Sequence, residues 1–220
     1  MSAALPVKKC GADHLVAGLA LPEVVLQSTK GGTASLSGAD RCVVYVYPWT
    51  GRPGYPNPPN WDDIPGAHGS TPEAEGFADR YAEFEAAGYD VVGISGQTSK
   101  EQAEFAGRLR LPFALLSDAG FAFADALRLP RFETGGVTYL KRLTLIVRDG
   151  VIAETIYPVE RPAEHAGEVL ARLAVGLSSA DTPHPSPLPR GRGGSAANDQ
   201  QSKREVFSVV SRRGRSPRRP

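Results

Sequence analysis

The feature that most constrains the fold is a continuous apolar run, Arg41-Cys-Val-Val-Tyr-Val-Tyr-Pro48, which a proline ends. Its side chains do not alternate between polar and apolar, so both faces of such a strand must be covered. A second run of the same kind, Tyr89 to Ser95, follows after a helical segment. Strands buried on both faces predict a sheet with helices on each side, that is, an α/β domain.

The segment between these two strands predicts a loop and then a helix. Residues 50–69 contain five prolines and four glycines, which is typical of irregular structure. In the helix, expected from about Pro72 to Ala87, Phe77, Tyr81 and Phe84 share one face at positions i, i+4 and i+7. Gly88 is placed to end the helix.

Three further helices are predicted downstream. One runs from Ser99 to about Arg110 and opens with Ser99-Lys-Glu-Gln102, which fits a capping box. Another opens at Ser117-Asp118 and runs through Leu127, and a closing helix spans Pro162 to Val175.

The remaining apolar runs predict strands. They are Leu21–Gln27, ended by a Gly31-Gly32 turn, Leu111–Leu116, Leu140–Val147 and Val151–Tyr157. Asp149-Gly150 joins the last two runs and is a strong signal for a hairpin, which makes that pair antiparallel. The order of strands and helices, closing with a hairpin and a helix, therefore predicts an α/β sandwich with a mixed central sheet.

The two ends of the chain differ from its body. Hydrophobic residues make up 41% of the sequence and charged residues 22%, which suits a globular domain. We expect that domain over residues 15–176, after a loose N-terminal segment at 1–14. Residues 177–220 are rich in proline and arginine, and the stretches 182–194 and 211–220 have almost no apolar residues, so they predict a disordered tail.

The tail is basic, with nine Lys/Arg against three Asp/Glu from Ser178 onward. Clustered arginines can contact the phosphates of nucleic acid without sequence preference. The tail has no interleaved aromatic residues, because Phe207 stands alone, so the sequence favours a solvated appendage over nucleic-acid binding. Both remain open.

Composition excludes several classes of protein. No segment approaches the roughly 18 to 20 apolar residues that span a bilayer, and no secretory signal with a cleavage site is evident. The two cysteines, Cys10 and Cys42, are too few for a disulfide framework, and the four histidines show no metal-ligand spacing. We expect a protein of the reducing cytoplasm that carries no cofactor or metal.

Ser70 is the candidate site residue with the most interpretations. Ser70 with Glu73 fits a capping box, and Thr71 before Pro72 fits an N-cap with proline at the first helical position. Ser70 could instead be a nucleophile at the helix N-terminus, but a serine there needs a base in hydrogen-bond reach. His68 is the one candidate base nearby, and the sequence lacks the G-x-S-x-G motif of a hydrolase.

Arg142 and the cysteines also have alternative interpretations. Arg142 begins an apolar strand, so it is either a snorkelling surface arginine or a cation that faces a catalytic anion. Cys42 lies in the central strand and is expected to be buried and inert. Cys10, with two lysines beside it, shows no sign of function.

Several segments together resemble the peroxiredoxins, the AhpC/TSA redoxin family, in their bacterioferritin-comigratory type. They are Val43–Pro48, the Thr50–Gly54 loop, Ser70-Thr71 at a helix start, Leu111–Asp118, Arg142–Gly150 and Tyr157-Pro158. The resemblance covers about Leu15 to Val175 and implies a thioredoxin-like sandwich.

The resemblance also implies roles for individual residues. Ser70 stands where the family has the cysteine that attacks peroxide, and Glu75 stands where this type often has the resolving cysteine. Arg142 matches the arginine that holds the thiolate and the peroxide. Pro48 matches the proline that ends the central strand, and Thr50 is the best match for the site's threonine, although Ala67 stands three residues before Ser70.

The function implied by the resemblance is reduction of peroxides by a thiol, with thioredoxin as the reductant. Both sulfurs are missing here, and a serine hydroxyl does not cycle through sulfenic acid. We therefore expect a catalytically impaired or inactive member of the family. The alternative is a non-catalytic redoxin-like protein whose pocket between Ser70 and Arg142 holds peroxide or another small ligand.

Overall fold

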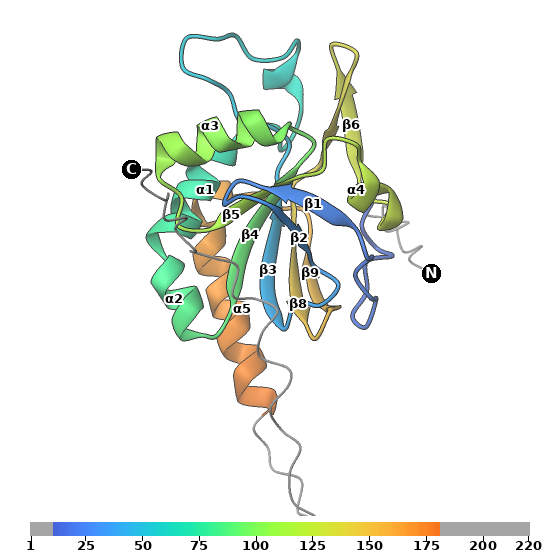
Figure 1. Cartoon of the computed structure of the whole chain (residues 1–220), viewed down its shortest axis with the longest axis vertical. Coiled ribbons are helices and arrows are strands. Elements are labelled where there is room, and N and C mark those ends of the chain that lie inside the picture. The colour runs from blue at the N-terminus through green and yellow to red at the C-terminus, as the bar shows by residue number, and fades with distance from the viewer. Residues whose placement is uncertain (1–10, 181–220) are drawn as a thin grey trace, which may run out of the picture. The chain divides into compact units, whose positions relative to one another are not determined.

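In the computed structural model, a seven-stranded mixed sheet forms the centre of the molecule (Figure 1). The structure describes residues 11–180, and side chains as far as residue 175. The sheet strands, in spatial order, are β2 (Thr33–Ser35), β1 (Val25–Ser28), β5 (Ala114–Ser117), β4 (Asp90–Ser95), β3 (Arg41–Val46), β8 (Leu143–Arg148) and β9 (Val151–Ile156). β3, β4 and β5 run parallel to one another, and the outer strands pair antiparallel.

Helices cover both faces of this sheet, as the doubly buried strands require. On one face lie α1 (Ser70–Asp79), α2 (Tyr81–Ala86), α3 (Ser99–Leu109) and α5 (His165–Ala180), which follows the 3-10 turn η2 (Pro162–Glu164). Their apolar side chains pack with Val43 and Tyr45 of β3. On the other face, Val44 and Val46 pack with α4 (Ala122–Ala126) and with the chain between Ala12 and Leu21. The predicted sandwich with a mixed central sheet is confirmed.

A separate two-stranded hairpin lies beside the end of the sheet that carries the functional site. It consists of β6 (Arg131–Thr134) and β7 (Val137–Leu140), joined through Gly135 and Gly136, both with positive φ. The 3-10 turn η1 (Trp61–Asp63) lies in the long loop after β3, and Trp61 packs against Tyr139 and Phe132 of the hairpin. The loop and the hairpin extend from the same end of the sheet (Figure 1).

Several predicted boundaries were wrong. The run expected as one strand over Leu140–Val147 is broken at Lys141-Arg142, because Leu140 pairs in the hairpin and Leu143 pairs with β3. The helix expected over 72–87 begins at Ser70 and is interrupted at Arg80. The helix expected from Ser117 begins at Ala122, and Asp118 accepts hydrogen bonds from the backbone N–H groups of its first turn.

The capping box of α3 lies one residue before the predicted one. Thr98 is the N-cap, and it exchanges hydrogen bonds with Glu101. Gln102, expected in the box, is fully buried and donates to Ser95 Oγ and to the carbonyl oxygen of Leu116. Both Thr98 with Glu101 and Ser99 with Gln102 match the capping pattern. Because Gln102 is buried, Thr98 and Glu101 form the capping box.

The ends of the described chain also extend beyond the predicted limits. Residues 11–14 pack on the domain, with Ala12 buried and the His14 ring bonded to the carbonyl oxygen of Leu127. α5 continues to Ala180, past the expected end at Val175. The predicted tail beyond residue 180 and Cys10 lie outside the described residues. None of the helices in the described part is long and apolar enough to cross a membrane.

Candidate functional site

The site is built at the N-terminus of α1, where Ser70 is the first helical residue and only 5% exposed. The N-cap is Gly69, with φ at 104° and no side-chain capping bond. Both predicted caps, Ser70 with Glu73 and Thr71 with Pro72, are therefore wrong. Gly69 suits the position because its backbone is left-handed and a Cβ there would lie 2.6 Å from Cγ of Pro162.

Arg142 reaches Ser70 from the break between β7 and β8. Its Nη2 donates to Ser70 Oγ at 3.1 Å and to the carbonyl oxygen of His68 at 3.0 Å. Its Nη1 donates to Glu73 Oε2. Arg142 is 3% exposed, so the interpretation as a snorkelling surface arginine is wrong. The break between β7 and β8 thus places this side chain against the first turn of α1.

Glu73 is fully buried and carries the negative charge that balances Arg142. Desolvation raises the pKa of Glu73 to about 7, against the lowering effect of the Arg142 guanidinium. The carboxylate and the guanidinium hold each other in place, and the guanidinium in turn fixes the hydroxyl of Ser70. Arg142 is thus a neutralised donor rather than a free cation.

The chemistry that Ser70 can perform follows from its neighbours. An arginine donates to its hydroxyl, and an arginine cannot act as a base. The ring of His68 bonds instead to Asp62 Oδ1 at 2.7 Å and is largely exposed. No general base contacts Ser70 among the described residues, so the geometry does not support a serine hydrolase.

Thr50 lines the same cavity as Ser70. The cavity has a volume of about 360 Å³. Thr50 donates through both its backbone N–H and its hydroxyl to Gln97 Oε1, each at 2.9 Å. Ala67, the residue three before Ser70, also lines this cavity and is buried. Pro48 is buried just after β3 and lies two residues before Thr50, but it does not line the cavity.

Glu75 is separated from this group of residues. It lies on the exposed face of α1, whereas Ser70, Glu73 and Ala74 are buried. The structure therefore brings Ser70 and Thr50 to one cavity, with Arg142 bonded to Ser70, and leaves Glu75 on the surface. Cys42 is buried in β3, and burial raises the pKa of its thiol well above the ordinary value. Within residues 11–180, no cluster of residues could hold a metal ion.

Two important residues were missed or misread from the sequence. Glu73 was interpreted only as a capping partner, whereas it neutralises Arg142. Gln97 was not recognised, although it fixes Thr50 through three hydrogen bonds. A polar residue two positions after the end of a buried parallel strand was the available signal for Gln97, because the ends of parallel strands often carry functional side chains.

Comparison with known proteins identifies relatives of this chain. The AhpC/TSA family model matches residues 65–155. The chloroplastic peroxiredoxin Q of Populus jackii is 34% identical over 159 residues, which cover 71% of this chain and 67% of that protein. The peroxiredoxin Q of Oryza sativa subsp. japonica is 33% identical, and the chain spans 65% of its length.

Solved structures show the same fold. The bacterioferritin comigratory protein of Xanthomonas campestris matches with a TM-score of 0.58 and 26% identity, covering 73% of this chain and 99% of that one. The predicted thioredoxin-like architecture and the resemblance drawn from the sequence are both confirmed. The chain belongs to the AhpC/TSA family of peroxiredoxins, in its peroxiredoxin Q and bacterioferritin-comigratory branch.

Proposed function

We propose that this chain derives from thiol-dependent peroxide reductases of antioxidant defence and has lost most or all of that turnover. By the family resemblance, Ser70 occupies the position of the attacking cysteine and Glu75 that of the resolving cysteine. The observation that carries the proposal is the Ser70 hydroxyl, held by Arg142 at 3.1 Å on the first turn of α1. This is the place where a peroxide-reducing thiolate would need its arginine.

Sulfur chemistry is what this arrangement lacks. A peroxidatic thiolate attacks the O–O bond and becomes a sulfenic acid, which a second thiol reduces. A serine hydroxyl has no thiolate-like form near neutral pH and does not enter that cycle. Cys42 does not replace it, because it is buried in β3 and its thiol pKa is raised by desolvation.

Any remaining redox activity would use the partners of the family. The comparison structure from Xanthomonas campestris is described in terms of alkyl peroxide reduction, and we extend to this chain the class of peroxide substrates. Thioredoxin is the proposed reductant. The relatives are named as chloroplastic, and a reducing compartment such as the cytoplasm remains a prediction for this chain.

A second candidate function is binding without catalysis. It is favoured by a cavity of about 360 Å³ that remains open beside Ser70, Thr50 and the start of α1. In this case, the fold retains the pocket of the family and uses it to hold a small polar ligand.

A coupled assay tests the proposal directly. The full chain is mixed with hydrogen peroxide or an alkyl hydroperoxide, thioredoxin, thioredoxin reductase and NADPH, and NADPH oxidation is followed. We expect a rate equal to that of the sample without the protein. A clearly higher rate that survives Cys42→Ser would contradict the proposed loss of activity.

Restoring the sulfurs gives the positive control. We expect the Ser70→Cys/Glu75→Cys double variant to consume peroxide, whereas Glu75→Cys alone stays inactive. Adding Arg142→Lys to the double variant should lower the restored rate, because lysine cannot contact both Glu73 and residue 70 in the same way. A double variant that is folded but inactive would mean that Arg142 and Ser70 do not form a peroxidase pocket.

A further inference from the structure

The cavity in front of Ser70 is larger than a peroxide reductase needs for hydrogen peroxide. Its volume of about 360 Å³ is roughly ten times the ~30 Å³ that one water molecule occupies in the liquid. Hydrogen peroxide has two heavy atoms and would leave most of this space to water. A ligand of several carbon atoms would fill it, and the volume falls within the range of small-molecule sites.

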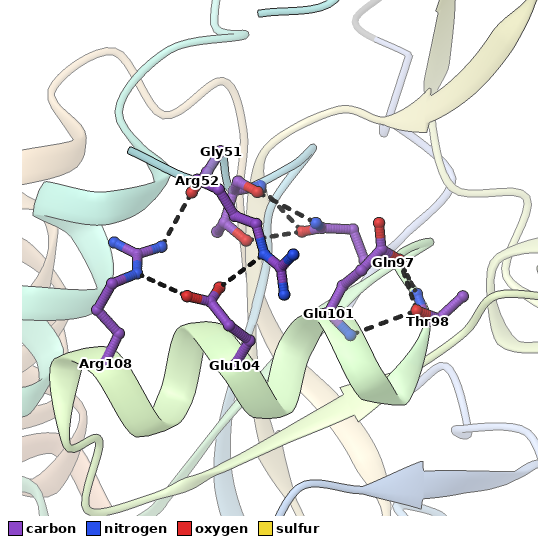
Figure 2. Close-up of polar contacts among 8 residues, drawn as sticks. Gly51, Arg52, Gln97, Thr98, Glu101, Glu104 and Arg108 are labelled. Carbon is purple, nitrogen blue, oxygen red and sulfur yellow. Dashed lines mark hydrogen bonds and ion pairs between the residues drawn. The ribbon is translucent and has the colours of Figure 1, made fainter. Parts of the chain in front are cut away.

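Segment 51–67 supplies one wall of this cavity, together with α3. This wall includes Arg52 and Arg108, and Trp49 and Thr50 line the cavity beside it. Figure 2 shows how the start of the segment is held on α3. Arg108 Nη2 donates to the carbonyl oxygen of Gly51 at 2.9 Å, and Gln97 both accepts from and donates to Thr50. The wall is therefore anchored before any ligand arrives, which lowers the entropy cost of binding.

The charge of the wall is positive. Arg52 and Arg108 both contact Glu104, through Nε–Oε2 at 3.5 Å and Nε–Oε1 at 3.1 Å (Figure 2). Among the described residues, Glu104 is the one carboxylate that contacts either arginine. Two guanidinium groups thus share one negative charge. No Asp or Glu of the described residues lines this cavity itself.

A second part of the cavity lining also favours an anion. There the N-terminus of the ten-residue helix α1 presents Ser70 and Thr71. The backbone N–H groups of a first helical turn and the helix dipole stabilise negative charge. Pro72 and Gly69 line the cavity as well and bring no charge of their own. The cavity therefore has two separate positive regions, one at Arg52 and Arg108 and one at the start of α1.

We infer that this cavity binds a small organic dianion, with one carboxylate at the start of α1 and the other at Arg52 and Arg108. The inference rests on the proposed function, because it names the ligand class for the pocket that the lost sulfurs leave behind. Arg52 and Arg108 are the specificity-determining residues. Neutral peroxides and monocarboxylates engage only one of the two positive regions.

Calorimetric titration of the full chain tests the inference with three probes: succinate, acetate and succinamide. Succinamide has nearly the shape of succinate but no charge. We expect saturable binding of succinate, at least about tenfold weaker binding of acetate, and no binding of succinamide, because two charged contacts are lost. Trp49 and Trp61 are the two tryptophans of the chain and both line the cavity, so their emission should change on binding.

Variants locate the second carboxylate. Arg52→Gln should weaken succinate binding about tenfold and leave the Arg108–Gly51 contact intact. Glu104→Gln should strengthen it about threefold or more, because it releases both arginines from their carboxylate. A gain in affinity cannot arise from misfolding. Arg131→Gln is the matched control, since Arg131 also pairs with a helix carboxylate, is 28% exposed and lies outside the cavity, and it should change affinity by less than about twofold.

Several results would overturn the inference. They are no saturable succinate binding up to about 10 mM, equal binding of succinate and succinamide, or Arg52→Gln and Glu104→Gln variants that bind as the unaltered chain does. None of these readouts depends on turnover. The peroxide assay and the titration can therefore fail independently, and peroxide turnover with tight succinate binding would contradict only the proposed loss of activity.

Discussion

Two groups of charged residues flank the cavity, and they differ in their contact with water. Below the start of α1, Glu73 and Arg142 are 0% and 3% exposed. On α3 and the adjoining loop, Arg52, Glu104 and Arg108 have side chains that are 47%, 32% and 29% exposed. The buried pair is fully committed to protein partners and positions Ser70. The exposed group retains contact with solvent and can exchange that solvent for a ligand.

The energetics of the two groups differ for the same reason. Removing one member of a buried ion pair leaves an uncompensated charge in a region of low dielectric constant, which is strongly destabilising. Exposed pairs contribute about 0–1 kcal/mol, because water and salt screen them. Substitutions on the two sides should therefore separate into large effects on stability and small ones.

The largest effect is expected for Arg142→Met. It leaves the Glu73 carboxyl buried without its cation, at a cost of about 3–5 kcal/mol in the free energy of unfolding above pH 7. The loss should be smaller and constant below pH 7, where Glu73 is protonated in both proteins, and should grow as the pH rises above 7, because the pKa of Glu73 is about 7 with Arg142 present and rises further without it. Urea unfolding at pH 5 and pH 8 measures both values.

The matched control is the Glu73→Gln/Arg142→Met double variant. It removes both charges, so it should be more stable at pH 8 than Arg142→Met alone. Equal stability of the two variants, or a loss that does not change with pH, would show that the buried pair is not what positions this end of α1.

The next effect concerns His165, which lies at the start of α5 and bonds to the hydroxyl of Thr144 in β8. Desolvation lowers the pKa of His165 to about 4, so the folded protein binds fewer protons than the unfolded chain between pH 4 and 6.5. The contribution to stability is complete above pH 6.5 and is lost as the pH falls through this window. The difference of about 2.5 pKa units corresponds to about 3 kcal/mol.

His165→Gln removes this titration and provides the comparison. Between pH 4 and 6.5, the free energy of unfolding should rise by about 3 kcal/mol more in the unaltered chain than in the variant. The opposite trend from Glu73 is present in both proteins and cancels in the difference. Parallel pH profiles for the two proteins would mean that the pKa of His165 is the same in the folded protein as in the unfolded chain, which would contradict the prediction.

A smaller effect is expected at the exposed start of α3. Thr98→Ala removes the N-cap that pairs with Glu101 and should cost about 1 kcal/mol. Ser99→Ala, one residue later, removes the cap that the sequence pattern favoured and should cost less than about 0.5 kcal/mol. Thermal unfolding of both variants compares them, and a larger loss for Ser99→Ala would place the cap at the originally predicted residue.

The smallest effect on stability belongs to the exposed charges beside the cavity. Glu104→Gln removes the carboxylate shared by Arg52 and Arg108 and should lower the free energy of unfolding by less than about 1 kcal/mol, with the loss diminishing in high salt. Urea unfolding at low and high ionic strength measures it. A loss as large as that for Arg142→Met would remove the distinction between the two groups.

Much of the fold followed from local patterns. The doubly buried strands around Val44 and Val91, the Asp149-Gly150 hairpin and the flanking helices are where the pattern of apolar residues predicts them. Boundaries failed where a residue has a tertiary partner. Leu140 pairs in the β6–β7 hairpin, so the strand expected from Leu140 to Val147 begins only at Leu143.

The site was predicted in part. The family resemblance selected Ser70, Arg142 and Thr50, and all three lie at the cavity or contact its residues. Glu73 was misread because S-x-x-E has the same spacing in a capping box and in a helix that buries its glutamate. Sequence spacing alone does not tell which way the carboxylate points, whereas the buried guanidinium of Arg142 does.

By itself, the amino-acid sequence determined the class of fold, the family and the absence of sulfur at Ser70 and Glu75, since each depends on residue type and order along the chain. The tertiary structure decided which charges are buried and which face the cavity. Glu73 and Arg142, and likewise Arg52 and Arg108, come together from segments that are 69 and 56 residues apart. Charge and desolvation act through space, so only the folded chain reveals that one pair holds Ser70 while the other is open to a ligand.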